Sequence, residues 1–159
     1  MTTLAWTDSL VLKQPKLDGV HEEFVGLLNA FGAALDAGDD ALPAYDALLA
    51  HTEAHFAMEE DWMARCGFDP QNCHASQHKM VLNVMREALR YAKELNDREP
   101  LKILRTELAG WFPQHAEMMD AALVFTMEQL GFDPETGERR GEAVAAAASH
   151  GCGSGSCGG

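Results

Sequence analysis

Residues 74–95 read HASQHKMVLNVMREALRYAKEL, and this stretch decides the fold class. Its histidines and apolar residues recur at alternating steps of three and four, which places them on one face of an α-helix. That face consists of His74, His78, Val81, Met85, Ala88, Ala92 and Leu95. The pattern predicts a long amphipathic helix from about Gln71 to Asn96.

Three further segments carry the same periodicity. They run from about Asp18 to Leu35, from about Leu42 to Cys66 and from about Pro100 to Leu130. Their predicted buried faces are, in chain order, His21, Phe24, Leu28, Phe31 and Leu35; Tyr45, Leu48, Thr52, His55, Glu59, Trp62 and Cys66; and Leu101, Leu104, Leu108, Trp111, His115, Met118, Ala122, Phe125 and Gln129. Four such helices with short connections predict an all-α protein, an up-down-up-down four-helix bundle with a short N-terminal arm.

Local signals predict the helix ends and one irregularity. Asp18 is a candidate N-cap for the first helix, because its side chain can accept a backbone N–H of the first turn. Gly-Phe-Asp-Pro occurs at residues 67–70 and again at 131–134. Glycine adopts the left-handed conformation after a helix and proline prevents its continuation, so both stretches predict helix ends. Pro113 predicts a bend within the fourth helix.

The remaining features of the sequence concern domain organisation and location. Residues 1–140 are predicted to form one four-helix domain, and residues 141–159 a flexible tail rich in Gly and Ser with two cysteines. The N-terminus lacks the features of a signal peptide, and no apolar run is long enough to span a bilayer, so we expect a cytoplasmic protein. The formal net charge of −13 disfavours binding to nucleic acid or to anionic membranes.

Polar residues interrupt the predicted buried faces. Five of the seven histidines fall on them, namely His21, His55, His74, His78 and His115, and Glu59 does so as well. Burying these groups without partners would cost several kcal/mol each. A metal centre would supply the missing partners.

The spacing of these residues supports one shared site. His55 and Glu59 are four residues apart, which places both on one face of a helix, one turn apart. The same spacing separates His74 from His78. Asp120 lies five residues after the last of the buried histidines, slightly off one face, but we expect its short carboxylate to reach the same centre.

The chemistry of the ligand set suggests two metal ions. Imidazole and carboxylate together suit iron, manganese or zinc, and seven ligands exceed what one tetrahedral zinc ion binds. If Glu59 and Asp120 bridge two ions together with an oxo or hydroxo group, the five histidines must divide three and two. The ion with two histidines then keeps an open position, where a small molecule can bind.

The motifs resemble those of the hemerythrin family, especially the single-domain bacteriohemerythrins. The resemblance covers about residues 4–132 and rests on Trp6, His21, His55-x3-Glu59, His74-x3-His78, Trp111 and His115-x4-Asp120. It implies a non-haem centre of two iron ions that binds dioxygen reversibly.

The resemblance also implies how the ligands divide. The saturated iron would be held by His74, His78 and His115, and the open iron by His21 and His55, with both carboxylates shared.

The resemblance extends to the surroundings of the open iron. Phe24, Phe56 and Trp111 are expected to form an apolar pocket that excludes water. Ala116 occupies a position where a bulky aliphatic residue is common, so we expect a wider oxygen pocket. His51, one turn before a ligand histidine, is an addition to the pattern. Four roles are open for it: a solvent-facing residue, a support for the ligand histidine, a proton relay or an extra metal ligand.

The predicted function is dioxygen binding, for storage, delivery or sensing. The alternative is an enzyme acting on peroxide or nitric oxide, but no predicted buried position outside the seven ligands offers an acid or base for it. A signalling module with a protein partner is a third interpretation. A ferritin-like enzyme is excluded, because none of the seven histidines follows a glutamate by three residues.

Overall fold

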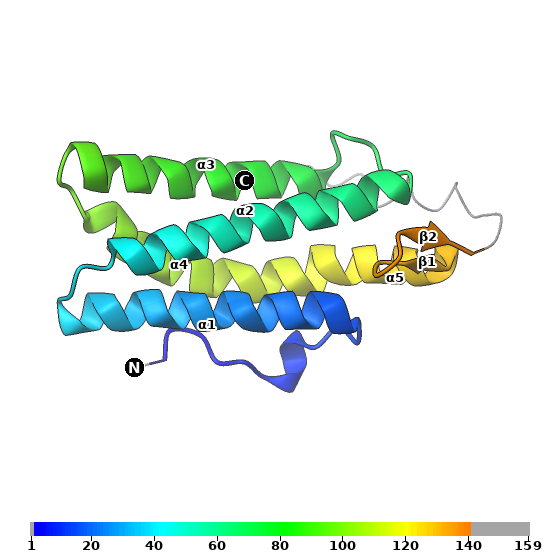
Figure 1. The fold of residues 1–159 in the computed structure, drawn as a ribbon, viewed down its shortest axis with the longest axis horizontal. Coiled ribbons are helices and arrows are strands. Elements are labelled where there is room, and N and C mark those ends of the chain that lie inside the picture. Colours follow the sequence, from blue (N-terminus) through cyan, green and yellow to red (C-terminus); the bar gives the residue numbers. More distant parts are fainter. Residues whose placement is uncertain (1, 141–159) are drawn as a thin grey trace.

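Four long helical rods lie side by side in the computed structural model, which describes residues 2–140 (Figure 1). The helices are α1 (Pro15–Ala37), α2 (Leu42–Arg65), α3 (Cys73–Glu94), α4 (Glu99–His115) and α5 (Ala121–Leu130), with the π-helical turn η2 (Ala116–Asp120) joining the last two into one rod. Each helix packs on the next in sequence, and α4 returns to contact α1. The prediction of an all-α, up-down four-helix bundle is therefore confirmed. The predicted tail, residues 141–159, lies outside the described residues.

The first helix begins three residues earlier than predicted, at Pro15. Proline is favoured at the first position of a helix because its missing N–H has no partner there anyway. Gln14 is the N-cap, and its side-chain oxygen accepts the Leu17 N–H at 2.8 Å. The prediction of Asp18 as the N-cap was wrong. Its carboxylate instead accepts the Leu12 N–H at 2.7 Å and so holds the preceding arm against the first turn.

Short additional elements extend the bundle at its two ends. The arm before α1 contains the 3₁₀ helix η1 (Asp8–Leu10) and runs along α1 (Figure 1). The Asn29 side chain fixes it by accepting the N–H groups of Thr3 and Leu4 at 2.8 and 2.9 Å. After α5, the strands β1 (Phe132–Asp133) and β2 (Glu138–Arg139) pair antiparallel, a hairpin that the sequence pattern did not predict.

Both predicted glycine stops are confirmed. Gly67 follows α2 with a φ of 85°, and Gly131 follows α5 with a φ of 60°. Residues with a side chain rarely adopt this left-handed region, so glycine ends each helix at little steric cost. The fourth helix, by contrast, continues through Pro113, and its departure from α geometry begins only at η2.

The π-helical turn changes which residues are buried. The N–H of Ala121 donates to the carbonyl of Ala116, five residues back, so η2 contains one residue more than an α-helical turn. The predicted face is accordingly wrong beyond this point: Met118 is 69% exposed and Phe125 62% exposed. Leu123 is buried instead, one position after the predicted Ala122.

Two apolar clusters fill the bundle interior and leave a gap between them. The larger contains Phe24, Leu48 and the surrounding residues of α3 and α4, and the smaller contains Leu17, Trp62 and the buried side of α5. Along α1, His21 lies between Leu17 of one cluster and Phe24 of the other. The polar residues are thus enclosed on both sides by apolar packing, which is the main stabilising term of a helical bundle.

The length and apolar content of a helix determine whether it can cross a membrane. None of the helices within residues 2–140 combines the length and the apolar content needed to cross a bilayer.

Candidate metal centre

Seven ionisable side chains converge in the gap between the two apolar clusters. All of them are at most 3% exposed, and they are His21, His55, Glu59, His74, His78, His115 and Asp120. They come from α1, α2, α3, α4 and η2, so every rod of the bundle contributes. The buried Thr52 is not one of them, because its hydroxyl donates to the Leu48 carbonyl of its own helix at 2.7 Å.

Helical spacing explains how neighbouring ligands reach one centre. On α2, His55 and Glu59 lie one turn apart, and His74 and His78 do so on α3. Asp120 follows the α4 histidine by five residues, and the π-helical turn between them returns its side chain to the same face. The sequence predicted this convergence, but not the backbone feature that permits it.

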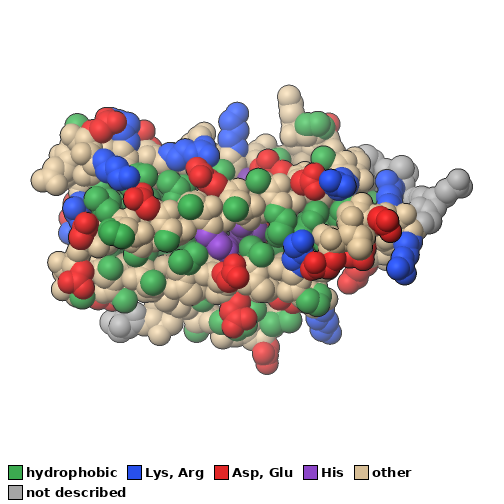
Figure 2. Space-filling view, in the orientation of Figure 1, with side chains coloured by type: hydrophobic (Ala, Val, Ile, Leu, Met, Phe, Trp, Pro, Cys, Tyr) green, Lys and Arg blue, Asp and Glu red, His purple; other side chains and the backbone are tan. Residues whose placement is uncertain are grey.

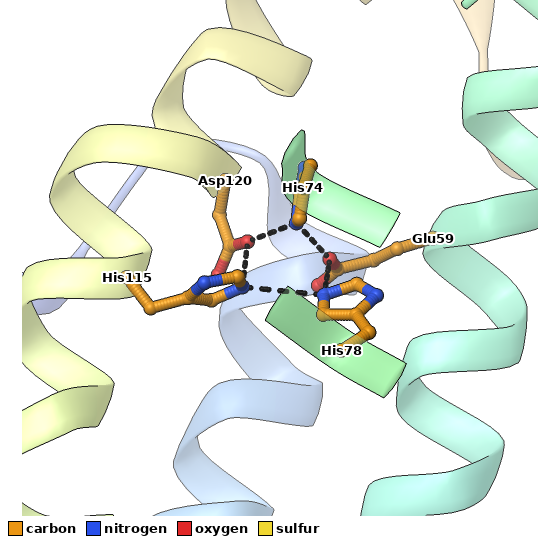
Figure 3. Close-up of side chains that lie close together, drawn as sticks. All are labelled: Glu59, His74, His78, His115 and Asp120. Carbon is orange, nitrogen blue, oxygen red and sulfur yellow. Dashed lines mark hydrogen bonds and ion pairs between the residues drawn. The ribbon is translucent and has the colours of Figure 1, made fainter. Parts of the chain in front are cut away.

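The first group of donors, here called the three-histidine pocket, consists of Glu59, His74, His78, His115 and Asp120. Figure 3 shows these side chains pointing toward one another from three helical rods. Oε2 of Glu59 lies 3.0 Å from Nε2 of His74 and 3.3 Å from Nε2 of His78. Oδ1 of Asp120 lies 2.9 Å from Nε2 of His74 and 3.0 Å from Nε2 of His115.

The second group, here called the two-histidine pocket, consists of His21, His55, Glu59 and Asp120. It uses the other oxygen of each carboxylate. Oε1 of Glu59 lies 2.5 Å from Nε2 of His55 and 3.7 Å from Nε2 of His21. Oδ2 of Asp120 lies 3.1 Å from Nε2 of His21. Each carboxylate therefore presents one oxygen to each pocket.

The donor spacing of the three-histidine pocket fits a small cation. Two ligands at right angles on an ion, with bonds of about 2.1 Å, lie about 3.0 Å apart. The neighbouring donors of the three-histidine pocket are 2.9–3.3 Å apart. Within residues 2–140, several of these buried atoms also lack a hydrogen-bond partner, namely Oε2 of Glu59, both oxygens of Asp120 and Nε2 of His21 and His74. Buried polar atoms of this kind are rare unless something else satisfies them.

The electrostatics of the cluster favour positive charge. Burial acts to lower the pKa of His21, but the carboxylates of Asp120 and Glu59 outweigh burial and raise it to about 9. The pKa of His74 is raised to about 9 for the same reasons. Burial acts to raise the pKa of both carboxyls, yet the surrounding histidines hold each well below its ordinary value. Without metal, protons supply the positive charge that the two carboxylates attract.

Aromatic rings enclose the cluster on both sides. Phe56 stacks on His78 with centroids 3.8 Å apart, and Trp111 stacks on His115 at 4.3 Å. Both rings thus lie against the three-histidine pocket, although Phe56 also contacts a histidine of the other pocket at 5.4 Å.

The two-histidine pocket has a different aromatic wall. Phe112 meets His21 edge to face at 5.0 Å, and Phe24 packs on Phe112 at 4.7 Å. The sequence analysis did not select Phe112, because it chose Trp111 for the buried face although both follow the spacing. Ala116 is buried at the end of α4.

His51 lies outside both pockets. Its Nε2 is 3.1 Å from a carboxylate oxygen of Glu23, and its ring is 6.1 Å from that of His55. Burial lowers the pKa of His51, against the effect of Glu23. Figure 2 shows histidine reaching the surface midway along this face of the bundle, with acidic side chains nearby.

The comparison with known protein families agrees with this geometry. The domain described as "Hemerythrin HHE cation binding domain" matches residues 14–124. The chain belongs to the hemerythrin family. The matched residues include all seven side chains of the cluster, so this hemerythrin domain is a cation-binding protein with a buried centre of histidine, glutamate and aspartate.

Several curated relatives are similar over most of their length. A bacteriohemerythrin of Ralstonia nicotianae is 39% identical over 133 residues, which cover 84% of this chain and 95% of the relative. A bacteriohemerythrin of Aquifex aeolicus is 31% identical over 118 residues, 72% of this chain and 88% of the relative. One of Stenotrophomonas maltophilia is 27% identical over 77% of this hemerythrin chain and 80% of the relative. No solved structure matches the chain significantly.

Proposed function

We propose that this protein binds dioxygen reversibly at a centre of two iron ions, for storage, delivery or sensing. The observation that carries the proposal is the position of the two shared carboxylates. Oε2 of Glu59 and Oδ1 of Asp120 face the three-histidine pocket, whereas Oε1 and Oδ2 face the two-histidine pocket. Such an arrangement suits two bridged ions, and it would be unnecessary for one.

The unequal number of histidines supports binding of a small ligand on one side. His74, His78 and His115 would hold one iron, and His21 and His55 the other. The second site would then have one protein ligand fewer and leave a coordination position open for dioxygen, and the two ferrous ions together would supply one electron each. Five neutral imidazoles and two carboxylates leave a less negative centre than carboxylate-rich sites, which favours binding over stronger oxygen activation.

The surroundings of the two-histidine pocket suit a small apolar ligand. Phe24 and Phe112 are about 1% exposed and pack next to His21, so they exclude water from that side. Exclusion of water restricts proton entry, and proton entry promotes loss of bound dioxygen as a reduced product. Buried aromatic side chains therefore support reversible binding of dioxygen, which is the proposed partner. The expected location of the protein is the cytoplasm.

Anaerobic loading followed by oxygen cycling tests the proposal. The metal-free protein is loaded with Fe²⁺ and its visible spectrum is recorded before oxygen, in oxygen and after oxygen is removed. We expect two irons per chain and an absorption band that appears with oxygen and disappears without it over repeated cycles. His21→Ala should abolish the band, whereas His51→Ala, which alters a histidine outside both pockets, should retain it.

Other results would contradict the proposal. A single irreversible oxidation in air would exclude reversible binding. Sustained turnover of peroxide or nitric oxide, lost in His21→Ala, would favour the enzyme alternative instead.

A further inference from the structure

The outer edges of the ligand histidines differ between the two pockets. All five imidazoles direct Nε2 at the shared carboxylates, so Nδ1 is the atom that points away. Figure 3 shows this for His115, whose second ring nitrogen is directed out of the cluster. A histidine that binds metal through Nε2 carries its proton on Nδ1, and that proton needs an acceptor.

His115 has such an acceptor. Its Nδ1 lies 2.9 Å from Oε1 of Gln77, a half-buried residue of α3. A carbonyl oxygen only accepts, so the ring must donate, and this fixes the tautomer that leaves Nε2 free for a metal. Trp111 stacks on the face of the same ring at 4.3 Å, with an interplanar angle of 24°. The ring is thus held at its edge by one residue and on its face by another.

The histidines of the two-histidine pocket are not held in this way. Nδ1 of His21 and Nδ1 of His55 are buried and have no hydrogen-bond partner within residues 2–140. In the three-histidine pocket, Nδ1 of His78 lies 3.4 Å from an oxygen of Glu60, but this contact does not have the geometry of a hydrogen bond. The amide of Gln77 therefore supplies an acceptor to one pocket that the other lacks.

We infer that Gln77 is a positioning residue for His115, and that it makes the three-histidine pocket the tighter of the two metal sites. The inference rests on the proposed two-metal centre and adds an order of filling to it. The three-histidine pocket binds the first ion, and the two-histidine pocket fills second. Loss of an outer acceptor of this kind typically lowers metal affinity by about 10–100-fold.

Titration of the full metal-free chain with Co²⁺ tests this role. The unsubstituted protein should bind two ions with different affinities. In Gln77→Ala the tighter affinity should fall by about 10–100-fold while the weaker one is unchanged. Gln77→Glu keeps an acceptor oxygen and should restore the tighter affinity to within a few-fold. Gln129→Ala, the same substitution on the exposed face of α5, is the matched control and should change neither affinity.

A spectroscopic measurement separates positioning from a general loss of structure. In the Co²⁺-loaded protein, the strongly shifted NMR signal of the His115 Nδ1 proton should exchange slowly with water, because Gln77 accepts it. Exchange should become at least several-fold faster in Gln77→Ala and slow again in Gln77→Glu.

The outcomes are distinguishable. If the unsubstituted protein binds two Co²⁺ ions but Gln77→Ala changes neither the tighter affinity nor the proton exchange, the role of Gln77 is wrong and the two-metal centre stands. An equal loss of Co²⁺ affinity at both sites in Gln77→Ala would also contradict the proposed role of Gln77. If the unsubstituted protein fails to bind two ions, the proposed centre itself is wrong, and the inference falls with it.

Discussion

Two carboxylates lie at the centre of the cluster and dominate its chemistry. Glu59 and Asp120 are fully buried, and each contacts histidines of both pockets. Two buried negative charges this close together repel each other, so the site requires positive charge nearby. Without metal, His21 and His74 provide it as protonated rings, because the carboxylates raise their pKa to about 9, and bound cations would provide it otherwise. At the scale of single residues, the carboxylates therefore determine how many cations the site binds.

Replacing one shared carboxylate should remove a metal ion. In Glu59→Gln the side chain keeps its shape but loses its charge and one of its two acceptor oxygens. We expect metal analysis to find at most one tightly bound ion per chain instead of two. Glu53→Gln, at a half-buried position of the same helix outside both pockets, should retain two. Two tightly bound ions in Glu59→Gln would contradict the shared role of this residue.

The stability of the metal-free protein should depend on pH in a defined direction. The pKa values of His21 and His74 are raised to about 9, so their stabilising contribution is complete below pH 6.5 and is lost as pH rises toward 9. The pKa values of Glu59 and Asp120 are lowered, so their contribution is complete above their unfolded values and is lost in acid. Burial lowers the pKa of His78, which opposes stability below pH 6.5.

Thermal unfolding of the chelated protein between pH 6 and pH 9 measures this dependence. The Tm should fall by several degrees as pH rises. The metal-loaded protein is the control and should not show the fall, because metal-bound imidazoles are already deprotonated. A Tm of the metal-free protein that rises over this range would contradict the prediction.

At the scale of helices, the π-helical turn is the feature that joins fold and site. It adds one residue between His115 and Asp120 while keeping both on one face. A π-helical turn is less favourable than an α-helical one and commonly occurs at functional sites. Four-residue spacing on an α-helix would serve equally well, as His55 and Glu59 show on α2.

Deletion of Met118 should therefore be tolerated. This exposed residue lies within η2, and its removal leaves His115 and the carboxylate four residues apart on a continuous α-helix. We expect circular dichroism to show an intact bundle, with an unchanged or higher Tm, and metal analysis to find two ions. Deletion of Thr126 in α5 is the matched control. It should turn Met127 and Leu130 by about 100° away from the interior and lower the Tm markedly. Loss of metal from the Met118 deletion would show that the π-helical turn itself is required.

The same turn explains where prediction from sequence succeeded and where it failed. Periodicity predicted most of the buried faces of α1, α2 and α3 and of α4 as far as His115, because regular α-helix repeats the same spacing throughout. It was wrong for Leu95, which follows the end of α3 and is 57% exposed, and it selected the half-buried Trp111 in place of the buried Phe112. It failed at Met118 and Phe125, since one added residue rotates everything that follows. The five-residue gap before Asp120 was the visible signal of this irregularity.

Prediction of the centre depended on contrast with the apolar pattern. Five histidines and Glu59 were evident because ionisable groups are unexpected on a buried face. Asp120 lay off the predicted face and was included only because it follows His115 by five residues. Phe112 and Gln77 gave no such signal: the first is one aromatic among apolar neighbours, and the second resembles an ordinary surface residue. Their roles follow only from which rings they contact in three dimensions.

At the scale of the whole molecule, the interior is divided into two apolar clusters with the polar centre between them. Each cluster is held together by hydrophobic burial, which requires no cofactor. The region between them is different, because several of its buried polar atoms lack hydrogen-bond partners within residues 2–140. The middle of the bundle should therefore be the part that depends most on metal.

Removal of metal should lower stability substantially. An ion present at about 1,000 times its Kd stabilises the folded state by about 4 kcal/mol, and two such ions should raise the Tm by roughly 10–30 °C. Thermal unfolding before and after chelation at pH 7 measures the difference. Fe²⁺ should restore the Tm, whereas Mg²⁺ should not, because it binds imidazole poorly. An unchanged Tm after complete metal removal would contradict a centre shared by all four rods.

The ligands come from distant parts of the chain, and this has a consequence for folding. His21 and Asp120 flank the two-histidine pocket although on the order of 100 residues separate them along the sequence. A covalent cross-link closing a loop of that length reduces the entropy of the unfolded chain by an equivalent of about 4.7 kcal/mol. A bound ion would impose a similar constraint for as long as it stays attached to both His21 and Asp120 during unfolding. The centre would then act as a reversible cross-link between α1 and the rod formed by α4, η2 and α5. Metal binding would form this cross-link, and a chelator would remove it.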